Sequence, residues 1–214
     1  MKIKEFIKEG EFPNEMKNYI IKDFEIFSEL KNKNHKKIIK YYLNNYNFAK
    51  IMNLLLDKKD ISIYKKIGYF AGNLIHCIEE YGKKVKKGVK STKTFFSGMQ
   101  LNIIDVLQYY RNINSSIAFP YFLSMTTKKE LAEISSKRNI SERKKKALFS
   151  VILQIEYLYE ENEKSCVFEL KDLSKFPEED EFILLPFTFM QVKSVDINPN
   201  KFIVDIKLKI KQNK

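Results

Sequence analysis

Residues 176–192 read FPEEDEFILLPFTFMQV, and in this stretch four acidic residues run directly into an apolar segment. The apolar residues 182–185 end at a proline, and residues 188–192 form a second run of the same kind. Such short runs, bounded by turn residues, predict buried β-strands. Because strand side chains alternate, Glu179 and Glu181 are predicted to lie on the same side of the first strand. Two carboxylates at the mouth of a strand are a candidate site, and a solvated acidic loop is the alternative.

The composition limits the class of protein. With 214 residues, of which 44% are hydrophobic and 14% aromatic, the chain is long and apolar enough for one sizeable folded domain, with or without a helical extension. The formal charge of +12 suggests an acidic partner, but it is carried almost entirely by lysine, with arginine only at positions 111, 138 and 143. Because phosphate-binding proteins favour arginine, we expect a protein partner with an acidic surface and not nucleic acid, although the charge leaves nucleic acid open.

Cysteine and histidine are too few and too scattered for metal or thiol chemistry. Cys77 and Cys166 lie far apart and, with His35 and His76, form no metal-ligand spacing and no persuasive nucleophile pair. We therefore expect no metal. The first 16 residues lack the apolar core of a signal peptide, and no segment is long and apolar enough to span a membrane. We expect an intracellular, cytoplasmic protein with no membrane partner.

The periodicity of apolar residues changes once along the chain. It predicts helices at residues 14–30, 35–56 and 61–81, the last ending at a glycine. From residue 92 onward the pattern predicts one helix, at 128–138, among strands at 94–99, 117–126, 147–159, 165–170, 182–186, 188–195 and 201–211, the last two forming a hairpin. Helices first and strands afterwards predict an α+β fold. The chain has no glycine-rich phosphate loop, which argues against P-loop and Rossmann nucleotide-binding folds.

Three stretches, in a fixed order, resemble motifs of the arginine-type branch of the mono-ADP-ribosyltransferase family. That branch has an Arg-Gly pair on a first strand, then a Phe-x-Ser-Thr-Ser strand, then a Glu-x-Glu pair that opens another strand. The corresponding stretches here are TFFSGMQL at residues 94–101, FPYFLSMTT at 119–127 and EDEFILLPFTFMQV at 179–192. Together with the preceding helices, the resemblance covers residues 35–211, which is most of the chain.

The resemblance implies a helical lobe followed by two small packed β-sheets that form a cleft for NAD. It divides the chain into an N-terminal helical extension at 1–34 and an ADP-ribosyltransferase-like domain at 35–214. Within the domain, the helical lobe corresponds to residues 35–90 and the β core to 91–214.

The resemblance also implies roles for individual residues. Glu181 is expected to stabilise the positive charge that develops at the ribose when nicotinamide leaves, and Glu179 to orient and deprotonate an acceptor arginine side chain. Ser124 is expected to brace Glu181 and the nicotinamide ribose of NAD, with Thr126 as a partial replacement for a second, cofactor-binding hydroxyl of the family motif. Gly98 is expected to allow NAD to approach the backbone.

Two aromatic residues and one departure from the family pattern complete the site. Phe122 or Phe176 is expected either to stack on nicotinamide or simply to pack in the core. Ser97 stands where the family has its NAD-binding arginine, so the resemblance suggests a degenerate member of the family at this position of the NAD site. A serine hydroxyl is short and neutral, and it cannot form the bidentate contact to an anion that an arginine makes.

These implications leave alternative functions. The first is an NAD-dependent protein mono-ADP-ribosyltransferase that transfers ADP-ribose to an acceptor protein, most simply to arginine. The second is a catalytically inactive module of the same fold that acts as a subunit of a larger assembly. A third is an NAD glycohydrolase, with water as the acceptor.

Overall fold

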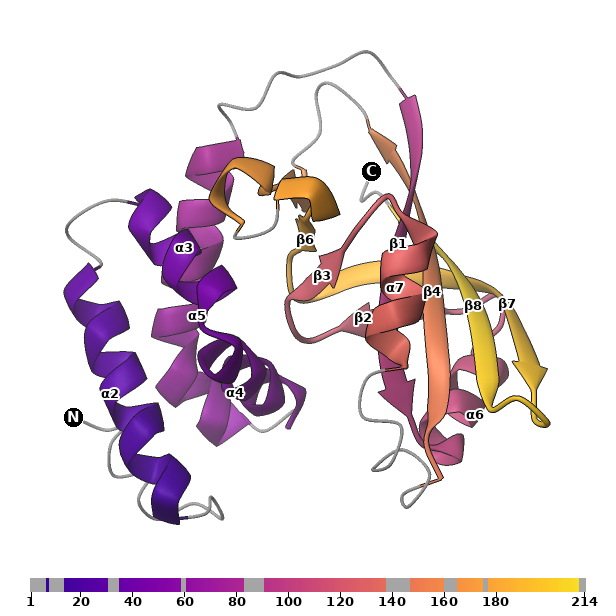
Figure 1. The fold of residues 1–214 in the computed structure, drawn as a ribbon, viewed down its shortest axis with the longest axis horizontal. Helices are drawn as coiled ribbons and strands as arrows, with labels where there is room; N and C mark the ends of the chain where they lie inside the picture. Colours follow the sequence, from indigo (N-terminus) through magenta and orange to yellow (C-terminus); the bar gives the residue numbers. More distant parts are fainter. Residues whose placement is uncertain are drawn as a thin grey trace. The chain divides into compact units, whose positions relative to one another are not determined.

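The computed structural model describes residues 7, 14–30, 35–58, 61–82, 91–137, 147–159, 165–174 and 177–211. The chain divides into two compact units (Figure 1). The helical unit comprises residues 1–86 and 172–177, and the sheet unit comprises residues 87–171 and 178–214. None of the helices in the described ranges is long and apolar enough to cross a membrane.

The helical unit contains α2 (Asn14–Leu30), α3 (His35–Asn44), α4 (Tyr46–Asp57) and α5 (Ile61–Gly82). The predicted single helix at 35–56 is wrong, because the chain breaks between α3 and α4 at Asn45. The Asn45 side chain accepts a hydrogen bond from the Phe48 backbone N–H at 3.0 Å and so caps α4. Asparagine is among the residues preferred at this position because its side chain satisfies a backbone donor that the helix leaves unpaired.

Aromatic rings form the core of the helical unit. Phe24 of α2 lies edge-on to Phe48 of α4 and to Phe70 of α5, with ring centroids 5.2 and 4.6 Å apart. Asp23, also on α2, accepts hydrogen bonds from Tyr41 and Asn45 at 2.6 and 3.0 Å. Helix α2 is therefore packed within this unit, and a separate role for residues 1–34 stays a prediction.

The sheet unit holds two sheets, which confirms the predicted α+β class. The larger has the strand order β1 (Ser91–Leu101), β4 (Phe149–Tyr159), β8 (Ile203–Ile210), β7 (Thr188–Asn198) and β2 (Ser116–Phe119). The smaller has the order β3 (Leu123–Met125), β6 (Phe182–Leu184) and β5 (Val167–Glu169). Neighbours run antiparallel except β4 and β8, which run parallel, and β7 and β8 form the predicted hairpin. Short 3₁₀ helices, η1 (Lys171–Leu173) and η2 (Pro177–Glu179), lie before β6.

In this unit one strand prediction is wrong and one helix was missed. The single strand predicted at 117–126 is two strands, β2 and β3, which belong to different sheets. The break falls at Pro120, which has no backbone N–H to continue a ladder. Helix α6 (Ile103–Arg111) was not predicted, although Asn102 caps it by accepting from the Asp105 backbone N–H at 2.9 Å.

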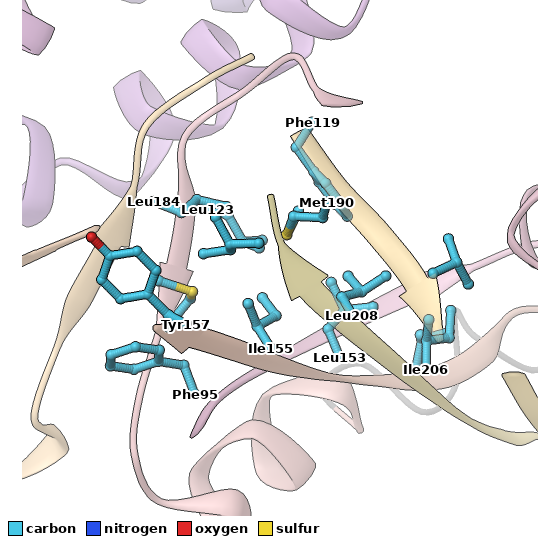
Figure 2. Packing of buried hydrophobic residues seen from close by; sticks show 14 of the residues in the cluster. Phe95, Phe119, Leu123, Leu153, Ile155, Tyr157, Leu184, Met190, Ile206 and Leu208 are labelled. Carbon is cyan, nitrogen blue, oxygen red and sulfur yellow. The ribbon is translucent and has the colours of Figure 1, made fainter. Parts of the chain in front are cut away.

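One hydrophobic core fills the sheet unit (Figure 2). Its buried side chains come from both sheets, as Leu123 and Leu184 of the small sheet and Leu153, Ile206 and Leu208 of the large one show. On β8 the buried positions alternate with exposed ones, as a half-buried strand requires.

Helix α7 (Lys129–Ser136) lies directly on the backbone of β1. A Cβ atom at Gly98 would stand 1.8 Å from the Ala132 carbonyl oxygen, so only glycine leaves room for the helix. The C-terminal end of α7 is held by two hydrogen bonds to the Ser136 carbonyl, from Gln100 at 3.1 Å and from Ser150 at 3.0 Å.

Gly98→Ala is expected to destabilise the protein. The added methyl group would force α7 off β1, at a cost of about 1–3 kcal/mol in the free energy of unfolding. Gly72→Ala is the matched control, because Gly72 lies inside α5 with no atom within 4 Å of its Cβ position. It should stabilise the protein by about 0.5–1 kcal/mol. Urea unfolding of both variants measures the difference, and equal stabilities would contradict the close packing of α7.

The two cysteines are expected to differ in reactivity. Burial raises the pKa of the Cys77 thiol to about 11, and Cys77 is 2% exposed on α5, whereas Cys166 is partly exposed before β5. Because the thiolate is the reactive form, iodoacetamide at pH 8 should alkylate Cys166 first and leave Cys77 unmodified in the folded protein. Mass spectrometry of tryptic peptides measures this, and in urea both cysteines should react. Rapid labelling of Cys77 in the native protein would contradict the burial of α5.

Candidate functional site

The two sheets are linked where β1 passes β3. The Phe96 backbone N–H donates to the Thr126 carbonyl at 2.7 Å, and the Thr126 N–H donates back to the Phe96 carbonyl at 2.9 Å. The next residue on β1, Ser97, is only 7% exposed, and its hydroxyl donates to the Ser124 carbonyl at 2.8 Å. The Ser97 hydroxyl thus links β1 to the backbone of β3 at this point.

Ser124 lies at the centre of β3 and connects it to the acidic stretch. Its neighbours Leu123 and Met125 are buried, whereas Ser124 is exposed, as strand alternation requires. Its hydroxyl donates to Glu181 Oε1 at 3.4 Å, a long hydrogen bond. Hydrogen bonds therefore run from Ser97 to the Ser124 carbonyl and from the Ser124 hydroxyl to Glu181. The structure brings together these three residues, which the sequence analysis had singled out.

The acidic segment, residues 178–181, is not part of a strand. Glu178 and Glu179 belong to η2, Asp180 has a positive φ of 47°, and β6 begins only at Phe182. The expectation that strand alternation places Glu179 and Glu181 on one side is therefore wrong, because a 3₁₀ turn and a left-handed residue intervene. The backbone of Glu181, just before the central strand of the small sheet, is fixed where its carbonyl accepts from the Leu170 N–H at 2.9 Å. The catalytic roles of both glutamates stay predictions.

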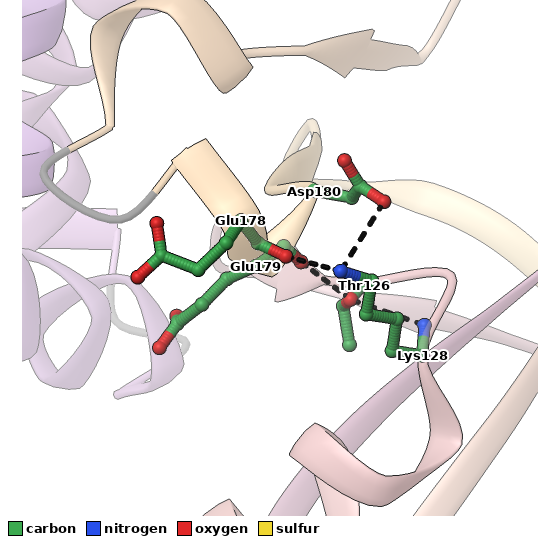
Figure 3. A network of polar contacts seen from close by, with 5 residues as sticks. All are labelled: Thr126, Lys128, Glu178, Glu179 and Asp180. Carbon is green, nitrogen blue, oxygen red and sulfur yellow. Dashed lines mark hydrogen bonds and ion pairs between the residues drawn. The ribbon is translucent and has the colours of Figure 1, made fainter.

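The turn between β3 and α7 holds the acidic segment (Figure 3). The Thr126 hydroxyl donates to the Glu179 carbonyl at 2.6 Å and accepts from the Lys128 backbone N–H at 3.1 Å. The Lys128 ammonium donates to the Glu178 carbonyl and lies 3.8 Å from Asp180 Oδ2. Sequence reasoning gave Thr126 a cofactor contact and missed Lys128, since no motif marks a lysine that follows a strand.

The remaining predicted site residues are Gly98, Phe122 and Phe176. The Cα face of Gly98 lies against α7, so the close approach predicted there is made by a helix, and an NAD contact stays a prediction. Phe122 is 2% exposed, as expected for core packing. Phe176 lies outside the described residues.

A positive charge lies beside the residue that follows Glu181. Lys93, exposed on β1, places its ammonium 5.6 Å from the ring centroid of Phe182. The same ring packs against Phe95, with centroids 4.8 Å apart. Arg111 ends helix α6 and is exposed. Among the residues that the structure describes, no group of three or more His, Cys, Asp or Glu side chains is arranged to hold a metal ion.

Comparison of the sequence with protein-family models and with curated proteins finds no match. Comparison of the fold with solved structures finds many matches, and those described below have sequence identities of 13–17%. Vis, an ADP-ribosyltransferase toxin from Vibrio splendidus, matches with 17% identity and a TM-score of 0.61 over 96% of this chain and 89% of Vis. Vis has also been solved in complex with agmatine.

Two further ADP-ribosyltransferases match at similar levels. The toxin Plx2a from Paenibacillus larvae has 14% identity and a TM-score of 0.55 over 98% of this chain and 96% of Plx2a. An ADP-ribosyltransferase from Clostridium botulinum has 13% identity and a TM-score of 0.54 over 94% of this chain and 97% of the clostridial chain. The resemblance found in the sequence is therefore confirmed at the level of the fold: this chain has the fold of the ADP-ribosyltransferase toxins.

Proposed function

We propose that this protein is an NAD-dependent ADP-ribosyltransferase that modifies an acceptor side chain, with arginine as the preferred acceptor. The observation that carries the proposal is the hydrogen bond from Ser124 to Glu181. It joins a carboxylate at the start of β6 to a hydroxyl on β3 within an ADP-ribosyltransferase fold. The sequence resemblance predicts Glu181 as a catalytic residue and Ser124 as the residue that braces it.

NAD would supply the ADP-ribosyl group, with nicotinamide as the leaving group. The carboxylate of Glu181 would stabilise the positive charge that develops at the ribose, an effect that requires a charge fixed in place beforehand. Two contacts fix it: the Ser124 hydroxyl binds its side chain, and the Leu170 N–H binds its backbone carbonyl. Glu181 is therefore the residue on which bond cleavage should depend.

Glu179 would orient and deprotonate the acceptor side chain. Its backbone is held by Thr126, and its side chain points the same way as that of Glu178, away from Lys128 (Figure 3). A carboxylate so placed attracts a guanidinium and can take its proton, which makes the acceptor nitrogen nucleophilic. The agmatine complex of Vis supports this class of acceptor, because agmatine ends in a guanidinium group.

Some of the candidate site residues fit a role in binding and cleaving NAD, and one does not. Glu181 and Ser124 form the acid and hydroxyl pair that the reaction needs, and Lys93 brings a positive charge to the neighbouring Phe182. Ser97 does not fit the role of an anion clamp, because its buried hydroxyl already binds the Ser124 carbonyl. This last observation favours the second candidate function, a non-catalytic module of a larger assembly with an acidic partner protein.

Glu181→Gln and Glu179→Gln are expected to separate nicotinamide release from transfer to the acceptor. Glu181→Gln should lower nicotinamide release and transfer to agmatine together, by about a hundredfold or more, because the stabilising charge is lost. Glu179→Gln should lower transfer by a similar factor and leave release largely intact, because only the acceptor loses its base. Labelled NAD with and without agmatine measures both activities.

Glu169→Gln is the control for these variants, since Glu169 lies on β5 beside β6 and is also partly buried. It should retain both activities. If the wild-type protein releases no nicotinamide at millimolar NAD, the enzymatic proposal is overturned and the non-catalytic module stands. Release that does not rise with any guanidinium acceptor would favour an NAD glycohydrolase.

Ser97→Ala is expected to lower kcat and leave the KM for NAD nearly unchanged. The hydroxyl positions β3 through the Ser124 carbonyl, and its loss should cost about 1 kcal/mol, or about a fivefold decrease in rate. Ser116→Ala, an exposed serine on β2, is the control and should change neither constant. A large rise in the KM for NAD would instead place Ser97 in direct contact with the dinucleotide.

A further inference from the structure

Lys128 precedes helix α7 and reaches across to the acidic segment. It occupies the N-cap position of α7, but its side chain makes no capping hydrogen bond. Its ammonium instead donates to the Glu178 carbonyl, 50 residues away in sequence, and pairs with Asp180 at 3.8 Å. The side chain of Lys128 is 47% exposed, so the pair contributes little to global stability. Its contacts therefore matter for the local conformation of the acidic segment.

Lys128 and Thr126 bind consecutive carbonyls. Thr126 binds that of Glu179 at 2.6 Å, and Lys128 binds that of Glu178. Both carbonyls lie at the end of η2, where a helical turn leaves its last acceptors without partners inside the turn. A lysine at this end of a turn satisfies one acceptor and places its positive charge where the carbonyls point. The two contacts together fix the backbone on which the Glu179 side chain stands.

Lys128 also separates the acidic side chains. Asp180 has a left-handed backbone, φ 47°, which a non-glycine residue adopts at some cost and which reverses the chain before β6. Its carboxylate turns towards Lys128, whereas the side chains of Glu178 and Glu179 point away from it (Figure 3). Without the ammonium, the repulsion between adjacent carboxylates in this segment would be less compensated, and Asp180 would lose this ion pair.

The two glutamates with proposed catalytic roles have different anchors. Glu181 is held by Ser124 and by the backbone of Leu170. The Glu179 carbonyl is held by Thr126, next to the carbonyl that Lys128 binds. Loss of Lys128 should therefore disturb Glu179 and leave Glu181 in place.

We propose that Lys128 is a positioning residue that holds the acidic segment so that Glu179 faces the acceptor, and that it controls transfer to the acceptor but not nicotinamide release. The proposal rests on the proposed function, because it assigns the acceptor step to Glu179. It adds to that function a residue outside the Glu-x-Glu pair. This residue determines which fraction of the ADP-ribose from cleaved NAD is transferred to the acceptor and which fraction to water.

The experiment compares Lys128→Met, Lys128→Arg and Lys129→Met. Lys128→Met keeps an apolar stem but removes the charge, and it should lower transfer to agmatine about tenfold while nicotinamide release without acceptor changes less than about twofold. Lys128→Arg should restore most of the transfer, because a guanidinium also donates to a carbonyl and pairs with Asp180. Lys129→Met is the control: Lys129 is 49% exposed, and its ion pair with Glu133 lies within α7. It should retain both activities.

Hydrogen exchange gives a second readout that does not require activity. Amides of residues 178–180 should exchange several-fold faster in Lys128→Met than in the wild type, and at the wild-type rate in Lys129→Met. Unchanged exchange would overturn the proposal, as would an equal fall in transfer and release or a failure of Lys128→Arg to restore transfer. If the wild type neither transfers nor releases nicotinamide, the proposed function and the catalytic role of Lys128 both fail, while exchange still shows whether Lys128 holds the segment.

Discussion

The backbone of Phe96 exchanges two hydrogen bonds with the backbone of Thr126, and the arrangement of the candidate site depends on this bridge between the sheets. It sets β3 beside β1 so that the Ser97 hydroxyl meets the Ser124 carbonyl. With its carbonyl held, Ser124 presents its side chain on the exposed face of β3, where it binds Glu181. Because β3 and β6 contain only three residues each, they have little pairing of their own to fix this geometry. The long strand β1 supplies the rigidity that the short strands lack.

The acidic segment shows how local conformation overrides a simple periodic pattern. Four consecutive carboxylates repel one another, and an extended strand would place alternate members side by side. The chain instead turns through η2 and the left-handed Asp180, and cationic and hydroxyl groups of the β3–α7 turn bind the carbonyls that this turn leaves unpaired. The carboxylates of Glu178 and Glu179 thereby point one way and that of Asp180 another (Figure 3).

The sequence predicted most elements of the fold, because apolar periodicity and aromatic content mark buried faces directly. It failed where a single polar contact or proline decides the outcome. Asn45 splits one predicted helix, Pro120 splits one predicted strand, and Asn102 starts a helix that periodicity does not reveal. For the site, motif resemblance pointed to Ser124 and Glu181, which lie in contact. Lys128 escaped prediction because one partner is a backbone carbonyl, which leaves no mark on the sequence, and the other, Asp180, is far away along the chain.

At position 97 the fold and the proposed reaction have different requirements, and the serine there meets that of the fold. Its hydroxyl satisfies the Ser124 carbonyl in a site that is only 7% exposed, which an arginine could not do without moving its large charged group towards solvent. The fold therefore gains a close contact between β1 and β3. Positive charge reaches the neighbourhood of Glu181 from other positions, from Lys93 above the Phe182 ring and from Lys128 beside Asp180. Both are lysines with flexible stems, which act as point charges and not as the planar fork of an arginine. In this chain the Glu181 side chain is therefore held by the Ser124 hydroxyl, and these two lysines, not the residue at position 97, bring positive charge to the neighbourhood of the acidic segment.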